Sequence, residues 1–187
     1  MKNIISILTL SVCLSFMACN SGSATNENNK EATSNATTPD AGQSGVKDET
    51  SAPNIVQVAS GSKDHTTLVA AVVAADLVDA LSNAGPFTVF APTNAAFAKL
   101  PAGTVEGLLK PEKKADLQNI LGYHTYVGVL KTEYMNDGQS FGQVFGGNIK
   151  ISKKDGKIMI NGKATIIASI PTSNGIIHVI DEVLLPE

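Results

Sequence analysis

The pattern of apolar and polar residues changes along the chain, from helical spacing to short runs typical of strands. Between residues 64 and 81, large apolar side chains recur every three or four positions, which predicts one helix with a buried stripe. Asp64 or Thr66 can cap its start, and Asn83-Ala84-Gly85-Pro86 ends it. Beyond it, short apolar runs predict strands at 87–90, 123–130, 139–145, 148–152, 157–160, 164–170 and 175–185.

Further helices and tight turns separate these strands. We expect a short helix ending near Leu100, a helical turn capped by Thr104, and a helix that begins at Pro111 and ends near Leu121. Residue types that tolerate positive φ predict tight turns at Asp155-Gly156, Asn161-Gly162 and 172–175. The predicted fold class is α+β, with the helices at one end of a β-rich body.

The segment from Thr88 to Phe97 joins a strand to a helix in ten residues. Thr88, Val89 and Phe90 favour a strand, and Pro92 ends it because proline cannot donate a ladder hydrogen bond. Thr93 and Asn94 are both strong helix N-caps before the helix that includes Phe97. By local physics alone, such a strand–turn–helix unit can be purely structural.

This segment nevertheless resembles the first signature of fasciclin domains. The closing segment 174–186, which contains Asn174, His178 and Asp181, resembles the second signature of the same family. Further similar motifs lie between the two in the family's order, so the resemblance covers residues 54–186. It implies a fasciclin-like β-wedge of about seven strands with several α-helices, and an extracellular adhesion function rather than catalysis.

The beginning of the chain predicts export. Residues 1–18 combine a basic start with a short apolar run, as in a secretory signal peptide, and Ala18-Cys19 resembles a bacterial lipoprotein box. Lipidation of Cys19 would anchor the mature chain to a membrane without spanning it. The alternative is an ordinary signal peptide with a chance cysteine, which would give a secreted protein.

Residues 19–52 are rich in Asn, Ser, Thr, Ala and Gly, which predicts a disordered tether between the anchor and a domain at 53–187. Cys13 and Cys19 are the only cysteines in the sequence, so the predicted domain folds without a disulfide. The residues after Cys19 favour the outer membrane over the inner one and leave its periplasmic or external face open.

Charge and composition limit the classes of partner that we expect for this protein. The net charge is −3 and the sequence contains no arginine, which argues against nucleic-acid recognition. Lysines 150, 153, 154 and 157 are explained by a solvated hairpin. A single domain without internal repeats favours a monomer.

Tyr123-His124 is the main candidate binding site. The pair matches the tyrosine–histidine motif that some animal fasciclin domains are proposed to use for integrin binding, a role that the resemblance alone implies. The alternative is that both side chains simply pack at a helix–strand junction. His178 lies in a run that is apolar on both faces, which indicates a hydrogen-bonded core residue, and Asp181 is expected to orient a loop.

Catalytic signatures are weak. His65, His124 and His178 lack the close spacing of zinc ligands, and neither a Gly-x-Ser-x-Gly elbow nor a nucleotide-binding loop is present in the sequence. We therefore expect no enzyme, metal or cofactor, although the fold could still assemble a Ser-His-Asp group.

Two functions follow from these expectations. The first is a membrane-anchored adhesion or interaction module that binds a cell-surface or matrix protein or a polysaccharide. The second is a carrier of a small lipophilic ligand, with Phe141, Phe145 and Met159 lining an apolar cleft; their alternative role is plain core packing.

Overall fold

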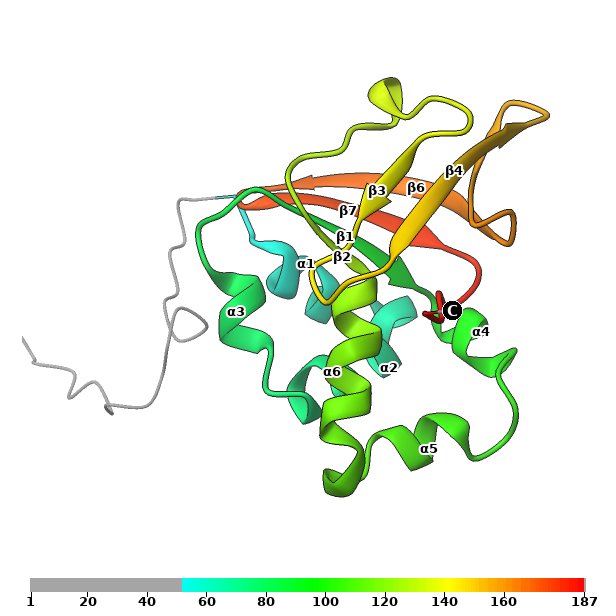
Figure 1. Cartoon of the computed structure of the whole chain (residues 1–187). Helices are drawn as coiled ribbons and strands as arrows, with labels where there is room; N and C mark the ends of the chain where they lie inside the picture. Colours follow the sequence, from blue (N-terminus) through cyan, green and yellow to red (C-terminus); the bar gives the residue numbers. More distant parts are fainter. Residues whose placement is uncertain (1–51, 187) are drawn as a thin grey trace, which may run out of the picture. The chain divides into compact units, whose positions relative to one another are not determined.

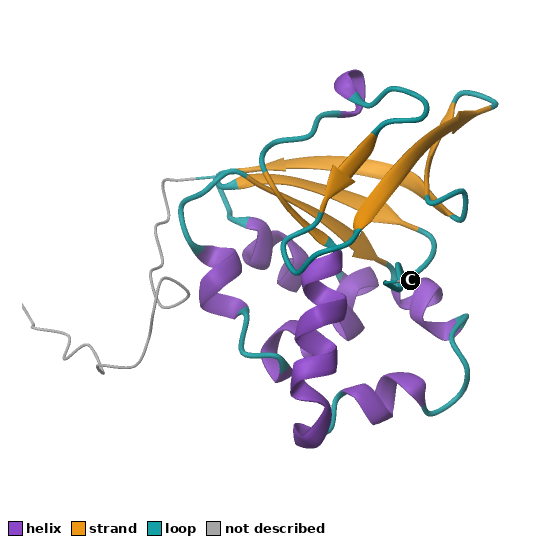
Figure 2. Cartoon of the chain, in the orientation of Figure 1, coloured by secondary structure: helices purple, strands orange, loops and turns teal. Residues whose placement is uncertain are grey.

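The computed structural model describes residues 52–186, which form a helical layer and a curved sheet (Figures 1 and 2). The helices are α1 Ile55–Gly61, η2 Lys63–His65, α2 Thr66–Ala74, α3 Val78–Ser82, α4 Asn94–Ala98, α5 Thr104–Leu108, η3 Pro111–Lys113, α6 Lys114–Tyr123 and η4 Thr132–Tyr134. The strands are β1 Phe87–Pro92, β2 Thr125–Val127, β3 Ser140–Gly142, β4 Asn148–Lys154, β5 Lys157–Ile160, β6 Ala164–Thr172 and β7 Gly175–Ile180. This is the α+β fold class that the sequence predicts.

The seven strands form one sheet in the order β2-β1-β7-β6-β5-β4-β3. β1 and β7 run parallel, and the other neighbouring pairs are antiparallel. The two ends of the sheet approach each other, because the Val144 amide after β3 donates a 3.0 Å hydrogen bond to the Thr125 carbonyl of β2. The sheet is therefore close to a barrel, and the larger helices gather on one side of it (Figure 2).

Alternating side chains of β1 and β7 divide the core in two. Val89 and Ile177 face the helices and pack with a cluster that includes Leu68 of α2 and Leu121 of α6. Phe90 and its neighbours on the opposite face pack inside the curve of the sheet. That second cluster contains Phe90, Tyr123, Leu130, Met135, Ile149, Ile151, Ile160, Ala164, Ile180 and Leu184. A central strand pair buried on both faces explains the continuous apolar runs in the sequence.

Several predicted elements are wrong in extent or cap. The strands expected over 139–145 and 175–185 are shorter, at Ser140–Gly142 and Gly175–Ile180. The helix expected over 64–81 is divided into α2 and α3, because Asp76 adopts a positive φ of 60°. The strand expected over 123–130 is limited to Thr125–Val127, and its start is delayed because Tyr123 is the last residue of α6. Thr104 does not cap its helix; the N-cap is Gly103 in the left-handed conformation, with φ of 82°.

The expected turns are confirmed. Asp155 and Gly156 connect β4 to β5 with φ of 51° and 75°, and Asn161 and Gly162 follow β5 with φ of 53° and 65°. Gly175, with φ of 156°, closes the turn between β6 and β7. Asp, Asn and Gly tolerate the positive φ that these turns require.

Candidate functional site

The Tyr123–His124 pair lies where α6 ends and the chain enters β2. Tyr123 is buried, donates from its hydroxyl to the Asn148 carbonyl at 2.9 Å, and accepts from the Asn161 side-chain amide at 3.0 Å. These bonds tie the end of α6 to β4 and to the turn after β5. The Tyr123 ring therefore serves as packing, and a direct binding role for it stays a prediction.

His124 is buried beside Tyr123 and is held by two backbone groups. Its Nδ1 lies 2.8 Å from the Ile120 carbonyl, and its Nε2 accepts from the Leu184 amide at 2.9 Å. An amide can only donate and a carbonyl can only accept, so the neutral ring carries its proton on Nδ1. Burial lowers the His124 pKa to about 4, against a smaller upward effect of the Ile120 hydrogen bond.

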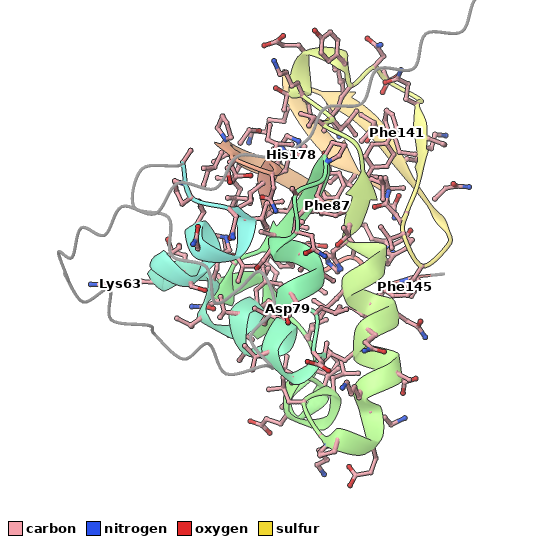
Figure 3. The ribbon with its side chains drawn as sticks, turned by 90° about the vertical axis from the view of Figure 1, so that its left-hand side faces the viewer. Lys63, Asp79, Phe87, Phe141, Phe145 and His178 are labelled. Atoms are coloured by element: carbon pink, nitrogen blue, oxygen red, sulfur yellow. The ribbon has the colours of Figure 1, made fainter. Side chains whose placement is uncertain are left out.

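An open groove of about 550 Å³ adjoins this junction. We call it the Tyr123 groove; its lining is Tyr123, Phe145, Gly146, Gly147, Asn148, Lys150, Asn161 and Pro186. The Phe145 side chain lies beside α6 (Figure 3), against Gly122, and remains 54% exposed. The groove thus combines an exposed aromatic ring, amide groups and one lysine over a buried tyrosine.

The first signature positions strand β1 against its neighbours. The Thr88 hydroxyl donates to the Gly128 carbonyl at 2.7 Å and accepts from the Leu130 amide at 2.9 Å. The Phe90 ring stacks on His178 with centroids 5.6 Å apart. Pro92 is the last residue of β1, as expected, and Phe97 packs against the helical core.

Thr93 and Asn94 have different roles. Thr93 caps α4 by accepting from the Ala96 amide at 3.2 Å, as expected. Asn94 does not cap this helix, because its Oδ1 accepts from the Thr67 amide at 3.0 Å and its Nδ2 donates to the Lys63 carbonyl at 2.9 Å. It fixes the start of α2 instead, a contact between segments far apart in sequence.

The second signature binds chain segments together. Asn174 Oδ1 accepts from the Ile55 amide at 3.0 Å, and its Nδ2 donates to the carbonyls of Leu81 and Asn83 at 2.8 and 3.0 Å. Asp181 accepts from the Thr165 amide at 2.6 Å and so fixes the start of β6. Both side chains therefore join elements of the domain.

His178 lies fully buried on β7, within the sheet (Figure 3). Its Nε2 is 2.7 Å from the Leu130 carbonyl, and its Nδ1 is 2.7 Å from the Ser169 hydroxyl. It is the hydrogen-bonded core histidine that the sequence predicts. Burial lowers its pKa, against a smaller upward effect of the Leu130 hydrogen bond. Ser169, its exposed partner, was not among the predicted site residues.

A second cavity, of about 130 Å³, lies between the helices and the sheet. Apolar side chains of α1, α2 and α3 line it together with Val89 and Ile177, and His124 contributes to its wall. The residues expected to line an apolar cleft are placed elsewhere. Phe141 stacks edge-on against Tyr126 at 5.7 Å, Phe145 lines the Tyr123 groove, and Met159 is on β5.

Residues 52–186 contain no group of three or more His, Cys, Asp and Glu side chains placed to hold a metal ion. In the same range, no helix is both long enough and apolar enough to cross a membrane. The signal peptide, Cys19 and the tether predicted for 1–52 lie almost entirely outside the described residues.

The sequence and the fold agree with those of known fasciclin domains. The profile of the fasciclin domain matches residues 63–186. Protein sll1483 of Synechocystis sp. is 53% identical over 136 residues, covering 73% of this chain and 75% of that protein. The chain therefore belongs to the fasciclin domain family, as its resemblance predicts.

More distant relatives carry the domain in other settings. Human periostin is 36% identical over 125 residues, which are 66% of this chain and 15% of periostin. Immunogenic protein MPT70 of Mycobacterium tuberculosis is 33% identical, over 71% of this chain and 68% of that protein. A solved FAS1 domain pair from the insect cell adhesion molecule Fasciclin I superposes with a TM-score of 0.62 at 19% identity. That match covers 72% of this chain and 51% of the insect chain and shows a shared fold.

Proposed function

We propose that this protein is an exported, lipid-anchored adhesion module that binds its partner through the Tyr123 groove. Fasciclin domains are an adhesion-type fold, and this favours a binding role over catalysis. The observation that carries the proposal is the groove itself, which opens beside the Tyr123–His124 junction and presents an exposed Phe145. Tyr123 and His124 act beneath this surface by holding its shape.

The chemistry of the groove suits an uncharged or weakly acidic partner. An exposed ring can stack on an apolar side chain or on a sugar face, while Asn161 and backbone groups offer hydrogen bonds. Lys150 is the single charged residue of its lining. A cell-surface or matrix protein, or a neutral polysaccharide, matches this combination.

The test compares two exposed aromatic residues. Phe145 is 54% exposed in the Tyr123 groove, whereas Tyr134 is 63% exposed on η4, outside its lining. Replacing Phe145 by Ser is expected to reduce attachment of cells carrying the protein by at least about tenfold, a loss typical of a central aromatic contact. Replacing Tyr134 by Ser is expected to leave attachment unchanged.

Circular dichroism and thermal melting must show that both variants are folded. Equal attachment by the two variants would contradict the groove assignment. If a deletion strain attaches as well as the parent strain to other cells, to matrix and in biofilms, the adhesion function itself is wrong.

A second function, carriage of a small apolar ligand, is favoured by the apolar cavity between the helices and the sheet. Its volume of about 130 Å³ is near that of an engineered apolar cavity of about 150 Å³ that stays dry and binds benzene. Ala59 of α1 lines the cavity, so Ala59→Leu should fill part of it. We expect native mass spectrometry to detect a bound small molecule in the parent protein and less of it in the variant. An empty parent protein would exclude this function.

A further inference from the structure

A buried histidine connects an exposed serine to a backbone carbonyl. Ser169 and His178 are directly opposite each other on the antiparallel strands β6 and β7, so their side chains share one face of the sheet. The Ser169 hydroxyl lies 2.7 Å from His178 Nδ1, and His178 Nε2 lies 2.7 Å from the Leu130 carbonyl. Ser169 is exposed, whereas His178 is completely buried.

The Leu130 carbonyl determines the proton positions in this series of hydrogen bonds. The Leu130 carbonyl can only accept, so His178 Nε2 must carry a proton. In the neutral ring Nδ1 is then unprotonated and accepts from the Ser169 hydroxyl. Stacking on Phe90 further fixes the ring orientation. The serine oxygen is thus bonded to a general base, and the base is oriented by a third group, as in activated nucleophiles.

The Ser169 hydroxyl opens into space for a small substrate. It lines a groove of about 680 Å³, between the end of the β6–β7 hairpin and the segment that follows β2. Val129, Pro171 and Ile176 supply apolar lining, and Lys131 and Glu133 supply one positive and one negative charge. We call this the Ser169 groove. It is separate from the Tyr123 groove, with no lining residue in common.

We propose that Ser169 is a nucleophilic acylation site that accepts the acyl group of short-chain esters or thioesters. Ser169 Oγ forms a bond to the acyl carbon while its proton moves to His178 Nδ1. The ester bond then breaks, and the alcohol or thiol leaves with that proton, so His178 returns to its neutral form. The product is an O-acyl serine, and the assignment covers this single transfer rather than turnover.

The surroundings favour this step at Ser169 over other serines. The apolar lining accommodates a short acyl chain, and Lys131 places one positive charge in the same groove, beside the negative charge of Glu133. Ser173 is also exposed and lines the same groove, but it is at the turn rather than opposite a histidine. It provides a matched comparison within one molecule.

The experiment uses the full chain and p-nitrophenyl acetate, with peptide mass spectrometry to locate the acetyl group. A general base contributes roughly a hundredfold or more to such a step, so Ser169 should acetylate at least about tenfold faster than Ser173. Ser169→Ala should abolish the fast phase of p-nitrophenol release, and Ser173→Ala should leave it unchanged. His178→Gln, if folded by circular dichroism, should slow it at least about tenfold.

The comparison of the two serines in the unmodified protein does not depend on the folding of any variant. Equal acetylation of Ser169 and Ser173 would overturn the proposal and leave the Ser169–His178 bond a structural one. Preferential acetylation of Lys131 would overturn it as well.

Discussion

The two buried histidines among the candidate residues hold separate segments of the fold together through hydrogen bonds. His124 and His178 are both neutral, but the first carries its proton on Nδ1 and the second on Nε2, because each ring faces a different set of backbone groups. The sequence predicted the burial of His178, since its strand is apolar on both faces. It could not predict the His124–Leu184 bond, which joins residues 60 positions apart.

Ser169 could have been found from the sequence. The turn predicted at residues 172–175 pairs Thr172 with Gly175, and counting back along the two strands places Ser169 opposite His178. What the pattern could not supply was the position of the Leu130 carbonyl, which reaches the histidine from the segment after β2.

Stability should fall in mild acid because of His124. Its pKa is about 4 in the folded protein and near 6.5 when unfolded, so the unfolded state binds more protons between these values. This stabilisation is fully present above about pH 6.5 and is lost as pH falls toward 4, by on the order of 3 kcal/mol. His65 and His178, whose pKa values burial also lowers, act in the same direction.

Urea unfolding at a series of pH values measures this effect. The variant His124→Gln should be less stable at neutral pH and should show a shallower decline in acid, because one of the three titrating groups is gone. If the free energy of unfolding declined with acid as steeply in His124→Gln as in the parent protein, the assignment to His124 would be contradicted.

The Tyr123 hydroxyl can be tested separately from its ring. Tyr123→Phe removes the bonds to Asn148 and Asn161 and keeps the packing, so we expect a loss of about 1 kcal/mol in the free energy of unfolding. Tyr134→Phe, at an exposed ring, should change the free energy by less than about 0.5 kcal/mol. Urea unfolding of both variants measures the difference, and equal effects would mean that these bonds contribute nothing.

At the scale of elements, the turns were predicted better than helix continuity and strand length. Residue types that tolerate positive φ identified the β4–β5 and β6–β7 turns, which are local. The break at Asp76 was missed because the apolar spacing continues through it into α3. The role of Asn94 was missed because its partners on η2 and α2 come from elsewhere in the sequence.

Gly175 is required where the parallel pair β1–β7 begins. It adopts a positive φ, and a methyl group on its Cα would overlap the Phe87 carbonyl oxygen across the strand pair. Gly175→Ala should therefore lower the free energy of unfolding by at least about 3 kcal/mol, since the Phe87 backbone must move and the positive φ adds strain. Gly162→Ala is the matched control, because Gly162 has a positive φ of 65° but no atom within 4 Å of the added methyl.

The control should cost about 1 kcal/mol, from backbone strain alone. Thermal melting of the two variants and the parent protein gives the comparison. Equal destabilisation by the two substitutions would show that close approach of Phe87 is unimportant.

At the scale of the whole molecule, the family resemblance predicted the fold more completely than the pattern of apolar and polar residues did. Periodicity predicted an α+β domain, but the sheet order and its near closure depend on contacts such as Val144 with Thr125, which no local rule supplies. The 130 Å³ cavity lies between the sheet and the helices, and the two grooves are open on the surface. The anchoring predicted at Cys19 is the property that decides what these grooves can reach.

Protease treatment of intact cells tests that anchoring and the orientation of the domain. If Cys19 is lipidated and the domain faces outward, protease should cut within residues 20–52, whose composition predicts a tether, and release a fragment close to 52–187. The hydrogen-bonded domain should resist cleavage. Cys19→Ala should shift the protein from the membrane fraction to the soluble fraction, and a periplasmic protein serves as the leakage control. Protection until the outer membrane is opened would exclude adhesion between cells and direct the search to periplasmic partners.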